Sequence, residues 1–197
     1  MTDMSTSQIL FRDAQQTDAR EIAGLFRVAA GGVADVVWDG LREGKEDAVD
    51  TGARRFARDG VAFSYRNCTL VESRDRVIGM LLAYPMRAEP GTGPDEVPPV
   101  LRPYAELEAD ATYYIAGIAV DPDLRGRGIG TKLLRVAELR AMTRGLDAMS
   151  LIAFEENYGS IRLYERLGYR VADRRPVVPH PMIRFRGDAV LMVKDLA

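Results

Sequence analysis

Short apolar runs separated by polar or glycine-containing turns recur along the chain, and they predict the strands of a sheet. Segments 77–84 and 148–154 are apolar throughout, as expected of buried strands. A charged turn at 73–76 favours a hairpin with the strand before it. The predicted strands are 9–14, 68–72, 77–84, 111–120, 148–154, 169–174 and 189–193.

Between these runs, apolar residues recur at the spacing of helices. Asp18 followed by Glu21 is typical of a helix start, and Ile22 and Phe26 then share a face. Gly31 follows as a stop signal. A second helical region reaches about residue 59 with an interruption near 40–46. Further predicted helices follow Gly130, span 157–167 and, as a short segment, lie within 101–108.

The length of 197 residues suits one domain with a full-sized core. Six of the ten prolines fall within 85–103. Because the strands before and after this stretch need each other to form a sheet, we expect a surface loop, mobile near 91–93, inside a single domain over 1–197.

Composition excludes several classes of function. The net charge of −2 and the pI of about 5.6 provide no positive field for nucleic acid. The single cysteine, Cys68, and the single histidine, His180, cannot form a disulfide framework or a multi-histidine metal site. The N-terminus does not resemble a signal peptide, and no apolar run approaches the roughly 20 residues that span a bilayer. We therefore expect a soluble cytoplasmic protein.

The stretch 115–130 combines a strand, a glycine-rich turn and the start of a helix. The first N–H groups of a helix lack internal partners and its dipole favours negative charge. Glycines allow an anion to approach the main chain closely, and two arginines add positive charge. The stretch therefore predicts a phosphate or diphosphate site, although a connector without a ligand fits the same pattern. The residues concerned are Arg125, Gly126, Arg127, Gly128, Ile129 and Gly130.

Two sequence motifs indicate which kind of diphosphate ligand this site binds. Arg125, Gly128 and Gly130 stand as Arg-x-x-Gly-x-Gly, which fits neither the P-loop nor the G-x-G-x-x-G motif. Downstream, segment 157–169 runs Asn-x-x-Ser-x-x-Leu-Tyr-x-x-x-Gly-Tyr. Together the two segments resemble the acyl-CoA pyrophosphate loop and the following helix of the GNAT superfamily of N-acetyltransferases.

The resemblance implies a single α/β domain with a mixed, mostly antiparallel sheet of six to seven strands flanked by helices. It implies acetyl-CoA as co-substrate, no metal, and a wedge-like opening between strands 111–120 and 148–154. The pantetheine arm would pair there with the backbone of the first strand, and an N–H near Ile118 or Ala119 would stabilise the oxyanion. The implied cofactor-binding residues are Ile118, Ala119, Val120, Arg125, Gly126, Arg127, Gly128, Ile129, Gly130, Asn157, Ser160 and Tyr164.

Tyr164 matches the tyrosine that protonates the departing thiolate in many family members. It also shares a helix face with Ile161 and Leu167, so packing is the alternative role. Asn157 stands at the start of the same helix, where it serves either as an N-cap or as a CoA contact.

The general base is less clear from the sequence. Several family members carry a glutamate on the central strand before the loop, whereas 114–117 contains no carboxylate. We take Glu155, just past strand 148–154, as the candidate base. Glu156, Glu72, His180 and a water relay stay open.

These features predict an N-acetyltransferase that acetylates an amine, expected to be a small molecule, by direct attack in a ternary complex. No acyl-cysteine intermediate is expected, because Cys68 lies in a strand without an activating motif. The alternatives are a non-catalytic acyl-CoA-sensing module and an acetyltransferase for protein lysines or N-termini. Trp38 is expected in the core, with a place in the acceptor pocket as the alternative, and a homodimer is left open. No nucleic-acid or membrane partner is expected.

Overall fold

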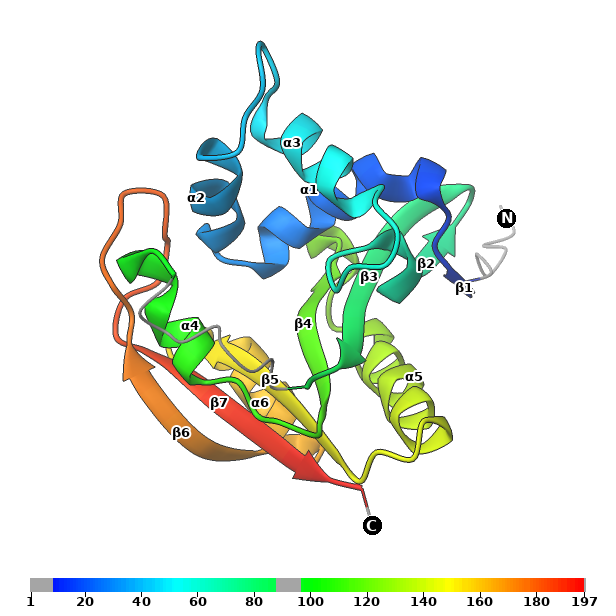
Figure 1. Ribbon diagram of the computed structural model, residues 1–197. Helices are drawn as coiled ribbons and strands as arrows, with labels where there is room; N and C mark the ends of the chain where they lie inside the picture. The colour runs from blue at the N-terminus through cyan, green and yellow to red at the C-terminus, as the bar shows by residue number, and fades with distance from the viewer. Residues whose placement is uncertain (1–8, 88–96, 197) are drawn as a thin grey trace.

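The computed structural model describes residues 9–87 and 97–196, which form a single α/β domain around a seven-stranded mixed sheet (Figure 1). The strand order is β1-β2-β3-β4-β5-β7-β6. All neighbouring strands are antiparallel except β4 and β5, so the predicted mixed, mostly antiparallel sheet is confirmed. The strands are β1 Ile9–Asp13, β2 Cys68–Ser73, β3 Arg76–Pro85, β4 Tyr113–Val120, β5 Ala148–Phe154, β6 Arg170–Pro176 and β7 Asp188–Asp195.

The predicted hairpin between β2 and β3 is confirmed. Arg74 and Asp75 both have positive φ, at 51° and 57°. Two consecutive residues in this conformation make the tight turn whose twist matches that of the flanking strands.

The predicted helices are confirmed to within a few residues at most of their ends. The helical region between β1 and β2 divides into three helices, with the interruption before Asp47. This residue caps the third helix by accepting a hydrogen bond from the Asp50 N–H at 2.8 Å. The helices are α1 Ala19–Ala29, α2 Val33–Asp39, α3 Ala48–Phe56, α4 Arg102–Glu106, α5 Ile129–Thr143 and α6 Tyr158–Arg166.

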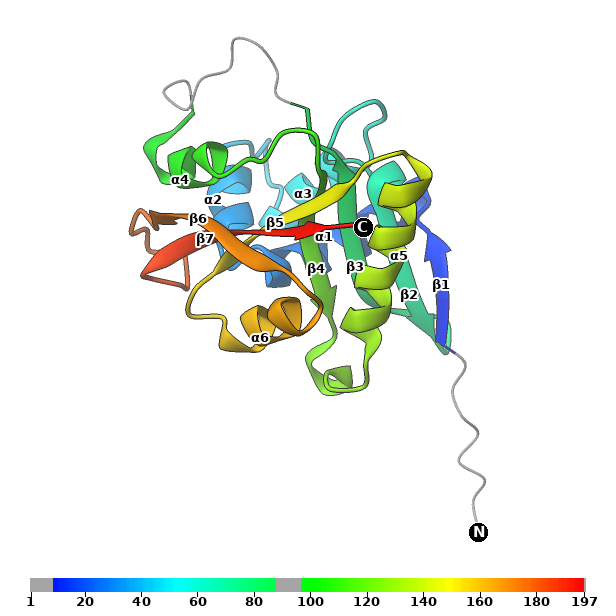
Figure 2. The same cartoon turned by 90° about the horizontal axis from the view of Figure 1, so that it is seen from below.

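Helices cover both faces of the sheet (Figure 2). The group α1–α3 packs on one face of the β1–β4 half, where Phe26 and Trp38 join a core with Leu70 and Met80. On the other face, α5 and α6 bury Leu133, Tyr164 and their neighbours against β3, β4, β5 and β7. A third cluster, around Leu107, lies where α4 and the β6–β7 loop meet β5 and β7.

The sheet opens between its two central strands. β4 and β5 pair only where Tyr113–Ile115 meets Met149–Leu151, although β4 continues to Val120 and β5 to Phe154. The β3–β4 register shifts between Leu82 and Ala83, which places a bulge at Ala116. The predicted wedge between these strands is therefore present.

The proline-rich stretch differs from its prediction in detail. β3 ends at Pro85, and the described chain resumes at 97 with a turn of 3-10 helix, Pro99–Leu101, before α4. The predicted mobility near 91–93 lies outside the described residues. β4 begins at Tyr113 rather than at Ala111, because Ala111 has a φ of 55° that no strand residue adopts.

Within 9–87 and 97–196 no helix is long and apolar enough to cross a membrane. The same residues contain no group of three or more His, Cys, Asp or Glu side chains that could hold a metal ion.

Candidate active site

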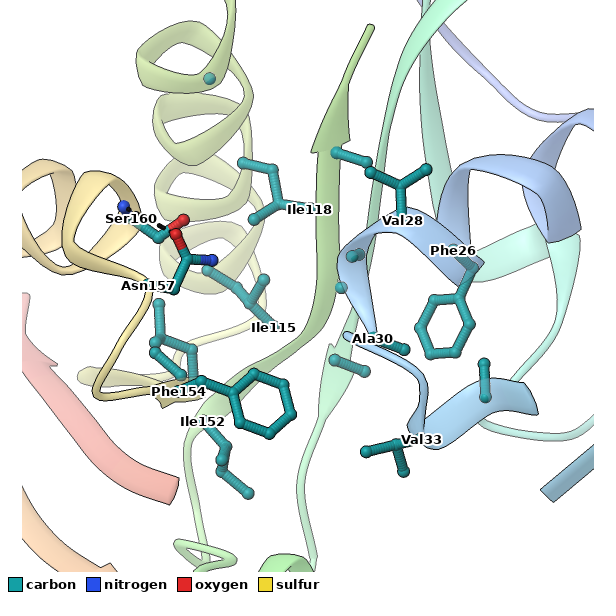
Figure 3. Close-up of a pocket in the computed structure, with 18 of the residues that line it drawn as sticks. Phe26, Val28, Ala30, Val33, Ile115, Ile118, Ile152, Phe154, Asn157 and Ser160 are labelled. Carbon is teal, nitrogen blue, oxygen red and sulfur yellow. Dashed lines mark hydrogen bonds between the residues drawn. The ribbon is translucent and has the colours of Figure 1, made fainter. Parts of the chain in front are cut away.

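A cavity of about 920 Å³ opens where β4 and β5 separate. Figure 3 shows side chains from β4, β5, α6 and the α1–α2 segment converging on it. We divide it into a loop half and an aromatic half. The loop half is lined by Ile118, Ala119, Val120, Arg125, Gly126, Gly128, Ile129, Gly130, Asn157, Ser160 and Tyr164. The aromatic half is lined by Phe26, Trp38, Arg55, Phe63, Tyr84, Tyr104, Glu108, Tyr114 and Phe154.

The N-terminus of α5 brings backbone N–H groups to the loop half. Gly128 is its N-cap, with a φ of 77° and no capping side chain, and Gly126 has a φ of 75°. The first helical hydrogen bond runs from Lys132 N–H to the Gly128 carbonyl at 3.1 Å, so the N–H groups of 129–131 find no partner in the described chain. A Cβ at Gly126 or Gly128 would meet no atom within 4 Å. Open space in front of free N–H groups is a geometry that binds anions.

Polar contacts hold this loop in place. The Asp121 carboxylate accepts a hydrogen bond from Asp123 N–H at 3.1 Å and pairs with Arg76 at 2.6 Å. Arg125 Nε donates to the Val120 carbonyl at 3.3 Å, which holds its side chain beside the end of β4. Arg127 is exposed on the turn and is not among the residues that line the cavity.

The free edge of β4 also faces the opening. Asp121 N–H donates to the Ile78 carbonyl of β3 at 2.8 Å, in the same register that pairs Ala119 with Met80. Alternate residues of an antiparallel strand turn their N–H and C=O toward the same neighbour. Ala119 therefore bonds β3, whereas Ile118 and Val120 direct their backbone groups toward the separation from β5.

Tyr164 lies buried between the loop half and the core. Only 7% of the residue is exposed, and its ring centre lies 5.8 Å from that of Tyr169. Burial raises the pKa of Tyr164 to about 12, although the Ser160 side chain partly offsets this effect. The phenol therefore stays protonated at neutral pH. Tyr164 therefore packs in the core and also lines the cavity.

Asn157 caps α6 and also lines the cavity. Its side-chain oxygen accepts a hydrogen bond from Ser160 N–H at 3.4 Å. The amide nitrogen points away from Ser160, toward the side of the cavity that β4 forms (Figure 3). The N-cap role and a place in the site are therefore compatible.

Glu155 and Glu156, which follow β5, do not line the cavity. Glu155, the candidate base from the sequence, accepts a hydrogen bond from Arg174 at 3.3 Å and is not among the residues that line the cavity. The Glu156 carboxylate accepts a hydrogen bond from Arg186 N–H at 2.9 Å. Both carboxylates are engaged with β6 and the β6–β7 loop.

The two other candidate bases also lie apart. Glu72 on β2 is paired with Arg12 at 2.7 Å, and this pairing lowers its pKa. The His180 ring accepts a hydrogen bond from Met182 N–H at 3.2 Å within the β6–β7 loop. Neither residue is among those that line the cavity.

Sequence reasoning missed two charged residues of the aromatic half. Glu108 is the one carboxylate among the described residues that line the cavity, and burial raises its pKa. Arg55 of α3 lines the opposite wall, and burial, Arg58 and Arg54 lower its pKa. Glu108 is exposed and follows the end of α4, and no local pattern in the sequence marks it. Arg55 lies among several arginines, and no local pattern marks which one faces inward.

Aromatic rings form much of the wall around these charges. Phe63 lies 5.6 Å from Phe26 and 6.1 Å from Tyr84, and Tyr84 lies 5.7 Å from Tyr114 between ring centres. A Cβ at Gly117 would come within 2.8 Å of Phe26. This contact explains why the central strand carries no side chain at that point.

Trp38 lies in the core, as expected, and also lines the cavity. It is 3% exposed and belongs to the core cluster of α1 and α3. A Cβ on Gly52 would approach its ring to 2.5 Å, so a glycine in α3 makes room for it.

Comparison with known proteins gives a match to the model of the acetyltransferase (GNAT) family over residues 37–169. An uncharacterized N-acetyltransferase from Methanocaldococcus jannaschii is 50% identical over 65 residues, which cover 33% of this chain and 29% of that protein. A mycothiol acetyltransferase from Corynebacterium aurimucosum is 36% identical over 64 residues, covering 32% of this chain and 20% of that protein. The chain thus spans less than a third of the length of either relative.

Solved structures share the fold. A crystal structure described as an acetyltransferase superposes with a TM-score of 0.64 at 19% identity, covering 95% of this chain and all of that one. A Salmonella typhimurium protein solved with acetyl-CoA gives 0.61 at 20% identity, covering 97% of this chain and 95% of that one. The ribosomal-protein-S18-alanine N-acetyltransferase from Escherichia coli gives 0.60 at 16% identity, covering 96% and 95%.

Proposed function

The chain belongs to the GNAT acetyltransferase family, and we propose that it transfers an acetyl group from acetyl-CoA to an amine by direct attack in a ternary complex. The observation that carries this proposal is the continuity of the loop half. Ile118 and Val120 form a strand edge without a β5 partner, where the Arg125 side chain engages only the Val120 carbonyl, and this edge leads to unpaired N–H groups at the start of α5. A chain of amides ending in a diphosphate is complementary to these two features in that order.

Acetyl-CoA fits the residues present. Backbone groups of Ile118 and Val120 would hold the amides of the pantetheine arm. The N–H groups of 129–131, the open approach at Gly126 and Gly128, and the Arg125 side chain would hold the diphosphate. Asn157 and Ser160 would supply further polar contacts from α6, whereas Arg127 would contribute only through its charge at longer range.

Two groups would stabilise charge that develops during transfer. Ile118 N–H points into the opening, and we assign it the oxyanion because Ala119 N–H is committed to β3. Tyr164 would donate a hydrogen bond to the leaving thiolate. A phenol with a pKa of about 12 is a weaker acid than a free thiol at about 8.5. Complete proton transfer therefore depends on the buried thiolate being destabilised in the same way as the phenolate.

A covalent cysteine route is disfavoured. Cys68 is fully buried, donates to the Ser64 carbonyl at 3.5 Å and is not among the residues that line the cavity. Burial raises the pKa of Cys68 to about 12, so the nucleophilic thiolate is scarce at neutral pH.

Glu155 stays a candidate base, but it reaches the amine only if it leaves Arg174. Its exposed position supports relay through water rather than direct contact. The extent of this domain over 1–197, a cytoplasmic location and a homodimer also stay predictions.

The proposal is tested with the full chain in two steps. Calorimetric titration with CoA should show saturable binding of one equivalent. Thiol release from acetyl-CoA should then accelerate when an accepted amine from a broad panel is added. Binding without amine-dependent release would favour a sensing module, and absence of binding would overturn the proposal.

A further inference from the structure

Two separate groups of aromatic rings bound the aromatic half of the cavity. The first ring group is Phe26 of α1, Phe63 of the segment before β2, Tyr84 of β3 and Tyr114 of β4, and all four line the cavity. Between ring centres, Phe63 lies 5.6 Å from Phe26 and 6.1 Å from Tyr84. Tyr84 in turn lies 5.7 Å from Tyr114, so the four rings form one continuous wall.

The second ring group, Tyr104 and Phe154, comes from α4 and β5. The two ring centres lie 6.1 Å apart, and both residues line the cavity. Phe185 of the β6–β7 loop stacks on Phe154 at 4.5 Å but is not among the lining residues. The Phe154 ring is therefore held in place by a contact outside the cavity.

The two ring groups are not in contact with each other. Among the residues that the structure describes, every ring pair that includes a member of one group leaves out the other group. Figure 3 shows Phe154 and Phe26 on opposite sides of the opening, with the small side chain of Ala30 between them in this view. Aromatic rings attract one another in offset or edge-to-face arrangements. A flat ring inserted in this space would face aromatic partners on both sides.

The charged residues of the aromatic half lie at its outer edge. Glu108 is exposed and Arg55 is half-buried, whereas Phe26 and Phe154 are 7% and 9% exposed. The phenols of Tyr84 and Tyr114 stay neutral, because burial raises the pKa of both. The interior therefore suits an apolar, uncharged body, and it lacks the buried second charge that would hold a diamine or an amino acid.

The first ring group reaches the reacting end of the cavity. A Cβ on Gly117 would come within 2.8 Å of the Phe26 ring, so this ring lies against β4 one residue before Ile118. The oxyanion is assigned to the N–H of Ile118, and neighbouring strand residues are only about 3.3 Å apart. A short alkyl chain is therefore enough to join an amine at Ile118 to a ring beside Phe26.

We propose that the acceptor is a primary arylalkylamine, in which a short alkyl chain joins the amino group to an aromatic ring that lies between the two ring groups. This inference rests on the proposed acetyl transfer and names its substrate class. The ring would be buried between Phe63 and Phe154 on opposite walls, and the amino group would lie beside Ile118.

The transfer balances without a further reactant. The acceptor enters as an ammonium ion and loses one proton to solvent, after which the neutral nitrogen attacks the thioester carbon. The C–N bond forms and the C–S bond breaks. The nitrogen then loses a second proton while the thiolate gains one beside Tyr164. The products are the N-acetyl arylalkylamine, free thiol and one proton in solution.

The experiment compares matched amines on the full wild-type chain, with thiol release from acetyl-CoA as the readout. The amines are phenethylamine, its saturated counterpart cyclohexylethylamine, and ethylamine. The kcat/KM for phenethylamine should exceed that for ethylamine by about 30-fold, because a ring is buried. It should exceed that for cyclohexylethylamine by about 5-fold, since only the aromatic ring interacts favourably with the two ring groups beyond its buried area.

Variants locate the ring within the cavity. Phe63→Leu and Phe154→Leu keep an apolar side chain but remove one aromatic partner, so each should lower the ratio of phenethylamine to cyclohexylethylamine by about 2-fold or more. The ratio is taken within each variant, so a loss of stability that slows both amines does not change it. If Phe63→Leu does not fold, Tyr84→Leu tests the same wall.

Each wall offers a matched control. Phe56 lies 5.4 Å from Phe26, and Phe185 lies 4.5 Å from Phe154, but neither is among the residues that line the cavity. Phe56→Leu and Phe185→Leu should therefore keep the wild-type ratio. Loss of the ratio in both controls would attribute the preference to general packing and overturn the placement of the ring.

The outcomes separate this inference from the proposed function. Equal kcat/KM for phenethylamine and cyclohexylethylamine, or an unchanged ratio in both lining variants, overturns the arylalkylamine acceptor and leaves acetyl transfer intact. Faster reaction of L-phenylalanine, putrescine or a peptide N-terminus than of phenethylamine would also overturn it. Absence of CoA binding together with absence of thiol release for every amine would remove the proposed function and this inference with it.

Discussion

The two halves of the cavity are built in different ways. The loop half uses main chain: free N–H groups at the start of α5, the exposed edge of β4, and glycines that keep side chains away. The aromatic half uses side chains from α1, α2, α3, α4 and three strands. A site made of backbone groups needs one continuous segment with a particular conformation. A site made of side chains can combine residues that are far apart in the sequence.

This difference predicts how each half responds to substitution. A change in the loop half should alter CoA binding whichever amine is used. A change in the aromatic half should alter the choice of amine while CoA affinity is kept. The following variants test that separation, beginning with the largest expected effect.

Gly128→Val should abolish CoA binding. A β-branched residue at a φ of 77° is strained, and its side chain would occupy the open approach to the free N–H groups. Gly145→Val is the matched control. Gly145 lies beyond the opposite end of α5, has a φ of 69° and has equally open space around it.

Calorimetric titration with CoA measures both variants, and circular dichroism checks that both fold. The two carry similar backbone strain, so only their position relative to the cavity differs. Wild-type affinity in Gly128→Val would overturn the assignment of the loop half, and loss of binding in both would attribute the effect to strain.

Tyr164→Phe should lower kcat by roughly 100-fold, because the ring remains and the proton donor is lost. The melting temperature should stay near that of the wild type, since the ring contact with Tyr169 at 5.8 Å is kept. CoA affinity should change little. Turnover at the wild-type rate with a saturating acceptor would leave Tyr164 as a packing residue, and weaker CoA binding alone would make it a cofactor anchor.

Gly32→Ala should disturb the aromatic half from its outer side. Gly32 has a φ of 105°, and a Cβ there would lie 1.9 Å from the Met182 carbonyl of the β6–β7 loop. We expect a loss of about 2–3 kcal/mol in the free energy of unfolding, typical of a backbone clash. Turnover of the acceptor should fall while CoA still binds. Equal loss of CoA affinity would show that the two halves are not independent.

The sequence predicts the fold and the loop half because both depend on local patterns. The run at 148–154 matches β5 at both ends, and the glycines at 126 and 128 occupy the positive-φ positions that the turn needs. The separation of β4 and β5 came only from the family resemblance. Apolar periodicity does not reveal where two neighbouring strands stop pairing.

Which carboxylate lines the cavity was harder to predict, because exposure and ion pairing are tertiary properties. Glu155 follows β5 directly, yet it is paired with Arg174 on β6. Glu108 is distant in sequence from both family motifs, and it reaches the cavity because α4 lies across the ends of β5 and β7 (Figure 1). A carboxylate's neighbours across the sheet decide its role, and a linear motif does not contain them.

Arg125→Ala should weaken CoA binding by about 10-fold, near the lower end for a charge-assisted hydrogen bond. Arg127→Ala should weaken it less, because Arg127 is exposed on the turn and acts only through a screened field. Titrations with CoA at two salt concentrations distinguish direct contact from a screened charge. The loss of affinity in Arg127→Ala should become smaller at high salt. Equal losses for both variants at high salt would place Arg127 in direct contact with the diphosphate.

Glu108→Gln should produce the smallest change in stability, and its sign depends on pH. Burial raises the pKa of Glu108 in the folded protein, so the ionised form is disfavoured there relative to the unfolded chain. Wild-type stability from this group is therefore full below the unfolded pKa and declines as pH rises through the folded one. Glutamine does not titrate, so the variant should match the wild type near pH 4 and melt about 1 °C higher near pH 8. Thermal melts across this range provide the measurement. A variant less stable than the wild type at pH 8 would mean that the protein itself supplies a cation for Glu108.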